Sequence, residues 1–174
     1  ASSGHTTQII VGANEENDED ILNRIDYLKK KYNVLYNYFS SFRPIKGTPL
    51  ENHEACDNKR TGRLYQMEYL FSKYNFTKKD IVLDDNGFLD LNNDPKYNIA
   101  LENMDKYPLD VNTAKYKELI KVPGIGLKSA RRITHLQKIG RKINNLKQLQ
   151  ELGVNINQCK IFVKVGGSYQ STLL

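Results

Sequence analysis

The stretch from Leu119 to Ile133 reads L-I-K-V-P-G-I-G-L-K-S-A-R-R-I. Apolar residues recur at helical spacing on both sides of the central P-G-I-G, which predicts two helices joined by a tight turn. Proline ends the first helix, near Lys121, because it lacks the N–H that a helix interior needs. The two glycines permit the reversal. The second helix is expected to run from about Leu127 to Ile139, with Gly140 just beyond its end.

The turn of this predicted hairpin has the chemistry of an anion-binding site. Its glycines leave no side chain between the backbone and a ligand. The N–H groups that open the second helix point outward, where the helix dipole favours negative charge. We therefore predict a contact with the sugar-phosphate backbone of a nucleic acid, which carries no sequence information; the alternative is a hairpin that only packs against another domain. The predicted contact residues are Lys121, Gly124, Ile125, Gly126, Lys128, Ser129, Arg131 and Arg132.

Flanking residues extend the predicted all-α module to 110–165. Asn112 or Thr113 is expected to cap the first helix with its side-chain oxygen. A weaker copy of the pattern follows at 146–162, with Gly153-Val154-Asn155 in the place of the turn. Because G-V-N departs from G-I-G, we expect this copy to complete the fold rather than to bind a second phosphate. Residues 166–174 lack periodicity and are expected to form a mobile tail.

Composition and charge limit the class of protein. A chain of 174 residues with 39% hydrophobic and 26% charged residues is not collagen, a low-complexity chain or a coiled-coil rod. Mean hydropathy is −0.61, and no apolar run approaches the ~18 residues of a membrane span. Residues 113–174 carry 12 Lys and Arg against two acids, a net charge of +10, whereas residues 1–112 carry −4. This asymmetry favours an anionic partner, nucleic acid first; a solvated lysine-rich surface is the alternative.

The two cysteines, Cys56 and Cys159, cannot form a disulfide framework. They fit a reducing compartment, and we predict a cytoplasmic protein. Together with the histidines they show no metal-ligand spacing, since His53 and Cys56 supply two ligands at best. We therefore predict no metal site in this chain. The chain begins at Ala1 within polar sequence, and we expect a fragment of a longer protein.

Residues 1–58 predict a βαβ unit. A strand at Thr7–Val11 precedes a helix from Asn17 or Asp18 to about Tyr32, and a second strand follows at Val34–Phe42. Such units belong to parallel sheets that helices cover. Two parallel strands do not make a viable sheet alone, so further strands are expected to come from elsewhere.

Residues 59–109 predict a mixed connecting region. Its expected elements are a helix at 59–74, a β-hairpin at 81–91 with Asn86-Gly87 as the turn, and a helix at 95–104. The fold class predicted for the whole chain is α+β.

The stretch 119–133 resembles the helix-hairpin-helix DNA-binding motif, and D-V-N-T-A at 110–114 is similar to the lead-in of competence-type members. The helix-hairpin-helix glycosylases need an aspartate downstream of the hairpin. No aspartate follows Asp110 in this sequence, which removes the standard base-excision mechanism.

Most of the chain resembles the C-terminal region of a radical S-adenosylmethionine (SAM) family of DNA modification or repair that ends in a helix-hairpin-helix. The matching blocks, in order, are G-H-T-T-Q-I-I-V-G-A at 4–13, E-N-D-E-D-I-L at 16–22, F-R-P-I-K-G-T-P-L-E-N-H at 42–53 and R-L-Y-Q at 63–66, followed by the hairpin blocks. The resemblance implies that residues 1–58 form the last βαβ part of a partial TIM-type barrel.

The same resemblance points to cofactor and substrate residues near the N-terminus and after the second predicted strand. Q-I-I-V-G-A-N-E at 8–15 is similar to a SAM-binding strand motif, in which Gly12 and Glu15 are the matching positions. The other interpretation is a strand-to-helix turn in which Gly12 only lets the chain reverse. Arg43 is the candidate for a substrate phosphate or carboxylate, against a structural ion pair.

The defining C-x-x-x-C-x-x-C of that family is absent, and thiolates are what hold a [4Fe–4S] cluster. No catalytic residue is therefore assigned here. SAM and the cluster are implied for a parent enzyme with its cysteines upstream, and the partners implied are DNA and the upstream barrel. The rival interpretations are a stand-alone, non-enzymatic DNA-binding module and a helical scaffold for protein interaction.

Overall fold

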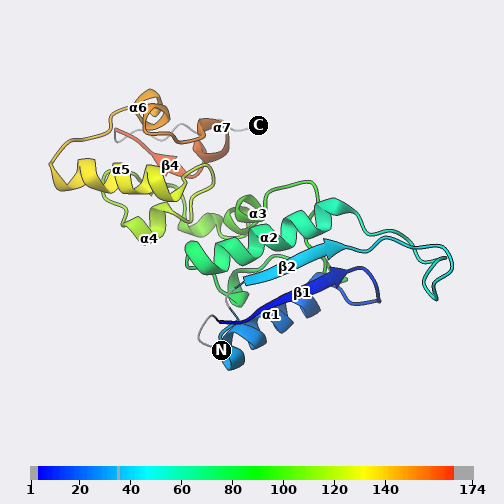
Figure 1. The fold of residues 1–174 in the computed structure, drawn as a ribbon. Helices are drawn as coiled ribbons and strands as arrows, with labels where there is room; N and C mark the ends of the chain where they lie inside the picture. Colours follow the sequence, from blue (N-terminus) through cyan, green and yellow to red (C-terminus); the bar gives the residue numbers. More distant parts are fainter. Residues whose placement is uncertain (1–3, 35, 167–174) are drawn as a thin grey trace. The chain divides into compact units, whose positions relative to one another are not determined.

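The computed structural model describes residues 4–34 and 36–166 (Figure 1). The tail expected at 166–174 lies outside these residues except for Gly166. The chain divides into two compact units, residues 1–69 with 81–95 (unit 1) and residues 70–80 with 96–174 (unit 2). The connecting region predicted at 59–109 is thus shared between the two units. Among the described residues, no helix is long and apolar enough to cross a membrane.

Unit 1 contains the predicted βαβ unit. Strand β1 (Thr6–Val11) pairs in parallel with β2 (Tyr36–Ser41) over six residues, and helix α1 (Asp18–Tyr32) connects them. Asn17 caps α1 by accepting a hydrogen bond from the Asp20 N–H (3.0 Å), as the polar sequence before the helix predicted. Alternate strand residues, such as Val11 and Phe39, are buried. The structure is therefore mixed α/β, with one short parallel pair where the sequence predicted the end of a barrel.

Helix α2 (Asn58–Lys73) starts in unit 1 and continues into unit 2, where the 3₁₀ turn η1 (Lys78–Asp80) follows. The β-hairpin predicted at 81–91 is wrong. The Asp84 carboxylate accepts from the N–H groups of Asn86 (3.0 Å) and Phe88 (2.8 Å), and the buried Asp18 carboxylate accepts from Leu89 N–H (2.9 Å). Side chains thus hold the backbone donors that a strand ladder would use.

Unit 2 is built from short helices around one core. After α3 (Pro95–Leu101) and η2 (Met104–Lys106) come α4 (Tyr116–Leu119), α5 (Leu127–Lys138), α6 (Leu146–Glu151) and α7 (Ile156–Cys159). A parallel pair of two-residue strands, β3 (Leu109–Asp110) and β4 (Val163–Lys164), joins the two ends of this module. The sequence did not predict this pair. The core of unit 2 includes Leu119, Ile125, Ile133, Leu149 and Phe162, all at most 1% exposed.

The cap predicted for the first helix of the hairpin is wrong. Helix α4 begins after Lys115, whose N–H donates to the Glu118 carboxylate (2.6 Å). The Asn112 side chain instead bonds to both backbone groups of Ile143, accepting from its N–H (2.8 Å) and donating to its carbonyl (2.9 Å). Asn112 therefore ties the lead-in of the hairpin to the segment after α5.

Candidate nucleic-acid interface

Helices α4 and α5 and the turn between them form the first hairpin, in which Gly124 can only be glycine. Its φ is +77°, and a Cβ built there would lie 2.3 Å from the Asn155 carbonyl oxygen. The same two residues are bonded, since Asn155 N–H donates to the Gly124 carbonyl (3.0 Å). The left-handed conformation and the close approach both exclude a side chain.

Gly126 differs from Gly124. Its backbone is extended (φ −88°, ψ 171°), a conformation open to any residue, and the space where its Cβ would lie is empty. It caps α5 without a side-chain hydrogen bond. Among the described residues, no acceptor contacts the N–H groups of Leu127, Lys128 or Ser129. The first turn of α5 therefore presents open donors next to a residue without a side chain.

Ile125 anchors the turn to the core of unit 2. Its side chain is 1% exposed within the core of unit 2. Its carbonyl accepts a hydrogen bond from the buried Lys96 ammonium group (2.7 Å), which also lies over the Tyr74 ring (4.7 Å to the centroid). The side chain of Ile125 thus holds the turn in place, and the buried Lys96 ammonium group holds its backbone carbonyl. Sequence reasoning missed Lys96, because no local pattern links it to residue 125.

The cations predicted around the turn fall into two groups. Lys128 and Arg131 are exposed, and neither has an ion-pair partner among the described residues. Arg132 is exposed as well, but it donates to the Leu152 carbonyl (3.1 Å). Buried Ser129 donates through Oγ to the Gly153 carbonyl (2.8 Å). Lys128 and Arg131 are therefore the cations free to meet an anion at this turn.

Lys121 is partly neutralised by a neighbour that the sequence did not indicate. Its Nζ lies 3.4 Å from the Asp80 carboxylate and over the Phe76 ring (4.7 Å to the centroid). The Tyr107 hydroxyl donates to the Lys121 carbonyl (3.4 Å). Burial, and then the charge of Asp80, raise the pKa of Tyr107 to about 12. The placement of Lys121 suits a role in bracing the turn as well as one toward an anion.

The second hairpin consists of α6, α7 and the turn between them, and the backbone groups of its turn are hydrogen-bonded within the fold. The N–H groups of Gly153, Val154 and Asn155 donate to backbone carbonyls, and that of Asn155 reaches the turn of the first hairpin. The Leu152 and Gly153 carbonyls accept from α5 as described above. The turn of the second hairpin therefore supports the first hairpin and leaves none of these three donors open.

A family model described as the helix-hairpin-helix motif matches residues 105–153. This segment carries that motif. No curated protein and no solved structure matches the chain significantly. The matched residues include β3, the first hairpin, α6 and the start of the second turn, so the motif covers the open donors of α5 and their cations.

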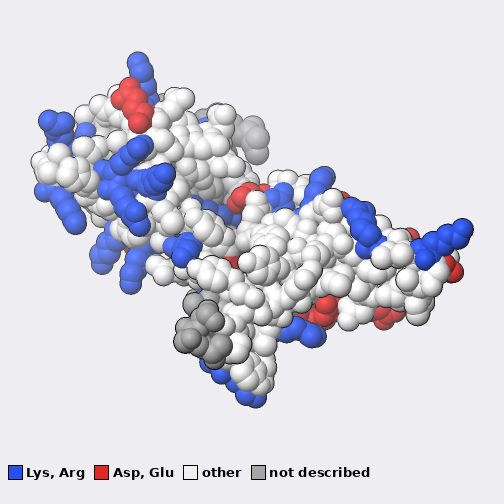
Figure 2. All heavy atoms as spheres, viewed as in Figure 1, with Lys and Arg blue, Asp and Glu red and all other residues white. Residues whose placement is uncertain are grey.

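Cations gather around the motif. Figure 2 shows lysine and arginine over the part of unit 2 that holds α4 and α5, with few acids on the same face. The exposed cations of this region are Lys115, Lys117, Lys128, Arg131, Arg132, Lys138, Arg141 and Lys142. This surface has the electrostatic character that a phosphate backbone requires.

The cofactor and substrate candidates lie in unit 1. Gly12 has φ +80°, and a Cβ there would lie 2.8 Å from Cys56 Cβ, so packing alone explains this glycine. Glu15 is exposed in the turn after β1. Arg43 is exposed and donates to the Asn58 side chain (2.9 Å). The assignment of Gly12 and Glu15 to SAM and of Arg43 to a substrate stays a prediction.

No group of three or more His, Cys, Asp or Glu that could hold a metal occurs within residues 4–34 and 36–166. Cys56 lies in unit 1 and Cys159 in unit 2, and both are buried. Burial raises the pKa of the Cys159 thiol to about 11, so it stays protonated at neutral pH. The residues present do not supply the three thiolates of a radical SAM cluster.

The contribution of the ion pair between Asp80 and Lys121 to stability can be tested through its dependence on pH. Burial acts to raise the Asp80 pKa, but the hydrogen bonds from Thr77 and the charge of Lys121 outweigh it and hold the pKa below its usual range. A lowered carboxyl pKa stabilises the fold above the unfolded pKa, about 3.9, and this contribution is lost as pH falls through the folded pKa. We expect Asp80→Asn to lower the urea midpoint of unit 2 at pH 7, with the difference from wild type shrinking below about pH 4. An equal difference at pH 3 and pH 7 would contradict this account.

Proposed function

We propose that residues 110–165 bind the sugar-phosphate backbone of DNA without sequence preference. The observation that carries this proposal is the first turn of α5. Within residues 4–34 and 36–166, its first N–H groups have no acceptor, and Lys128 and Arg131 beside it have no ion-pair partner. The Cβ space of Gly126 is empty. A phosphate at this point accepts from backbone donors and meets two cations. The helix-hairpin-helix match at 105–153 supports the same partner.

Within this proposal the residues have different roles. Gly126, Lys128 and Arg131 meet the phosphate, together with the N–H of Ser129. Gly124, Ile125 and the Ser129 hydroxyl hold the turn in shape, and Arg132 ties α5 to the second hairpin. These contacts read no base edges, so affinity is expected to depend on salt and little on sequence.

The first test is a fluorescence-anisotropy titration of a labelled duplex with the whole chain over a salt series. The logarithm of the binding constant is expected to fall linearly with the logarithm of salt concentration, by about 0.9 per phosphate contact, with several contacts in total. Two duplexes of unrelated sequence should give the same line. No binding at low salt would contradict DNA binding and favour a protein-interaction scaffold.

Gly126→Val tests the close approach of the phosphate. The backbone at Gly126 accepts valine and its Cβ space is empty, so the fold is expected to remain intact. The added side chain keeps a phosphate from the open N–H groups. Hydrogen bonds to charged groups contribute about 1.5–3 kcal/mol, so we expect duplex affinity to fall about 10-fold or more.

Gly62→Val is the matched control, because its Cβ space is also empty and it lies in the unit 1 part of α2. This variant should bind DNA as wild type does. If both variants bind DNA with the affinity of the wild type, Gly126 does not lie in the interface.

A wider proposal concerns residues 1–58. The sequence resemblance, supported by the observed parallel βαβ unit, leads us to propose that they form the last βαβ part of the partial barrel of a radical SAM enzyme of DNA modification or repair. The motif would then deliver DNA to an active site upstream. Because the cluster ligands are absent from this chain, no chemical step is assigned to its residues. The full-length transcript is expected to encode C-x-x-x-C-x-x-C upstream, and a transcript without it would contradict the enzyme proposal.

A further inference from the structure

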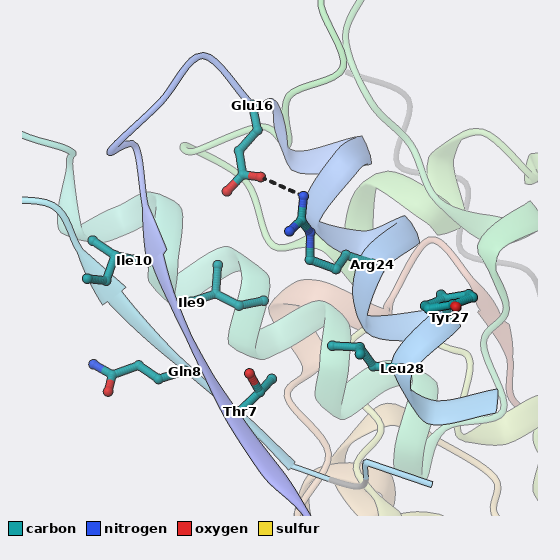
Figure 3. A pocket seen from close by; sticks show the side chains of 8 residues that line it. All are labelled: Thr7, Gln8, Ile9, Ile10, Glu16, Arg24, Tyr27 and Leu28. Carbon is teal, nitrogen blue, oxygen red and sulfur yellow. Dashed lines mark hydrogen bonds and ion pairs between the residues drawn. The ribbon is translucent and has the colours of Figure 1, made fainter. Parts of the chain in front are cut away.

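Most cations of this chain keep their side chains in solvent. Arg24 is an example, because its side chain is 60% exposed while it meets the Glu16 carboxylate (3.5 Å) beside a hollow lined by β1 and α1 (Figure 3). Within residues 4–34 and 36–166, Lys96 is the only buried lysine or arginine, with 8% of its surface exposed. Removing an ammonium group from water is costly unless polar partners hold it. A buried lysine therefore calls for a role that an apolar side chain could not fill.

The partners of Lys96 place its charge against the turn of the first hairpin. Lys96 lies in the first turn of α3, and its ammonium group donates to the Ile125 carbonyl (2.7 Å). The Tyr74 ring lies 4.7 Å from the same ammonium group, and the face of an aromatic ring attracts a cation. All three residues belong to unit 2. The charge is thus fixed at one backbone group of the turn, where solvent screens it little.

The peptide unit between Ile125 and Gly126 connects this charge to the open donors of the turn. In a trans peptide unit the C=O and the N–H point in opposite directions. The Ile125 carbonyl faces Lys96, so the Gly126 N–H points away from it. Among the described residues, no acceptor contacts this N–H, and the Cβ space of Gly126 is empty. A cation at one end of a peptide unit strengthens the donor at the other end, because linked hydrogen bonds polarise one another.

We propose that Lys96 is a positioning residue of the phosphate site. Its charge, acting through the Ile125–Gly126 peptide, strengthens the Gly126 N–H as a donor to phosphate and attracts the bound anion. Lys96 is buried and touches no phosphate, unlike Lys128 and Arg131, which are exposed. This inference rests on the function proposed for residues 110–165.

Lys96→Met tests the charge, because methionine is unbranched and adapts to the space that lysine leaves. With a hydrogen bond at each end of the peptide unit, the ammonium group and the phosphate lie about 8 Å apart. Coulomb attraction over this distance, partly screened by solvent, predicts that duplex affinity falls by about 10-fold. The slope of log affinity against log salt counts the phosphates neutralised by direct contact. It should therefore keep its wild-type value.

Lys160→Met is the matched control, because Lys160 is exposed in unit 2 and the variant loses the same charge. It should lower duplex affinity by less than Lys96→Met does. An equal loss would assign the effect to net charge and overturn the inference.

The amide of Gly126 in the DNA-free chain distinguishes polarisation from packing. Its proton signal should move upfield in Lys96→Met, because the cation no longer polarises the peptide. An unchanged Gly126 amide would reduce Lys96 to a packing residue, and a salt slope lower by about 0.9 would make it a direct phosphate contact. Either result overturns the inference.

Wild-type affinity in Lys96→Met would overturn this inference and leave the proposed function intact, whereas a wild-type chain that binds no duplex would overturn both. If the methionine variant does not fold, hydrogen exchange of the Lys96 ammonium group in the wild-type chain decides. Saturating duplex should slow this exchange, because a phosphate on the Gly126 N–H strengthens the bond at the other end of the peptide. No change on adding duplex would overturn the inference.

Discussion

Replacing Lys128 and Arg131 together by glutamine is expected to weaken duplex binding by about 60-fold at 0.1 M salt. Both side chains are exposed at the start of α5, and neither has an ion-pair partner among the described residues. Each cation that neutralises a phosphate contributes about 0.9 to the slope of log affinity against log salt. Losing two contacts lowers that slope by about 1.8, and lines that meet at 1 M salt then differ by about 60-fold at 0.1 M. Anisotropy over the salt series measures both the slope and the affinity.

Lys160→Gln with Lys164→Gln is the matched control, because both lysines are exposed in unit 2 and the change in net charge is the same. This control should lower the slope by less than the first pair does. If both pairs lower the slope equally, DNA affinity depends only on the net charge of unit 2, and the proposal of a contact localised at the turn is wrong.

Gly124→Ala is expected to destabilise unit 2 by about 3 kcal/mol. An alanine at φ +77° costs about 1–2 kcal/mol, and its Cβ would lie 2.3 Å from the Asn155 carbonyl oxygen, an overpacking that costs about 1–3 kcal/mol more. The turn and the second hairpin would have to separate. Urea unfolding followed through the amide signals of unit 2 measures the loss.

Gly126→Ala is the control for this prediction, because its backbone is extended and its Cβ space is empty. It should change the free energy of unfolding by less than about 1 kcal/mol. If Gly124→Ala is no more destabilising than Gly126→Ala, the packing of the two hairpins through Gly124 is not what holds the turn.

The elements with strong local signals were predictable from the sequence. Helix α1 has an asparagine cap, three acids at its start and three lysines at its end, and it begins and ends where those signals place it. The hairpin helices follow from Pro123 and the glycines around it, and α5 spans Leu127–Lys138 against a prediction of Leu127–Ile139. These signals act within one or two helical turns, so no tertiary contact is needed to interpret them.

Elements that depend on distant partners were not predictable. Residues 81–91 carry the turn signal of a β-hairpin, yet Asp18, 71 positions away from Leu89, takes the donor that a strand would use. Asn112 bonds to Ile143 instead of capping α4. The β3–β4 pair has two residues per strand, too few for an alternating pattern to show.

The same distinction holds within the candidate site. The glycines and cations of the turn could be chosen from the sequence, because the chemistry of an anion site lies within one short segment. Which of these residues contact the anion and which hold the turn in shape could not be predicted from the sequence. It depends on the second hairpin, whose Asn155 fixes Gly124 and whose carbonyls engage Ser129 and Arg132.

Titration of the ¹⁵N-labelled chain with a short DNA duplex at low salt, followed by amide chemical shifts, tests the central claim most directly. The account predicts that the largest shifts occur at Gly126, Leu127, Lys128 and Ser129, and that they reverse when salt is raised. The amides of the second turn, at 153–155, should move little, because their N–H groups are already bonded. Shifts centred outside the first turn of α5, or none at all, would contradict it.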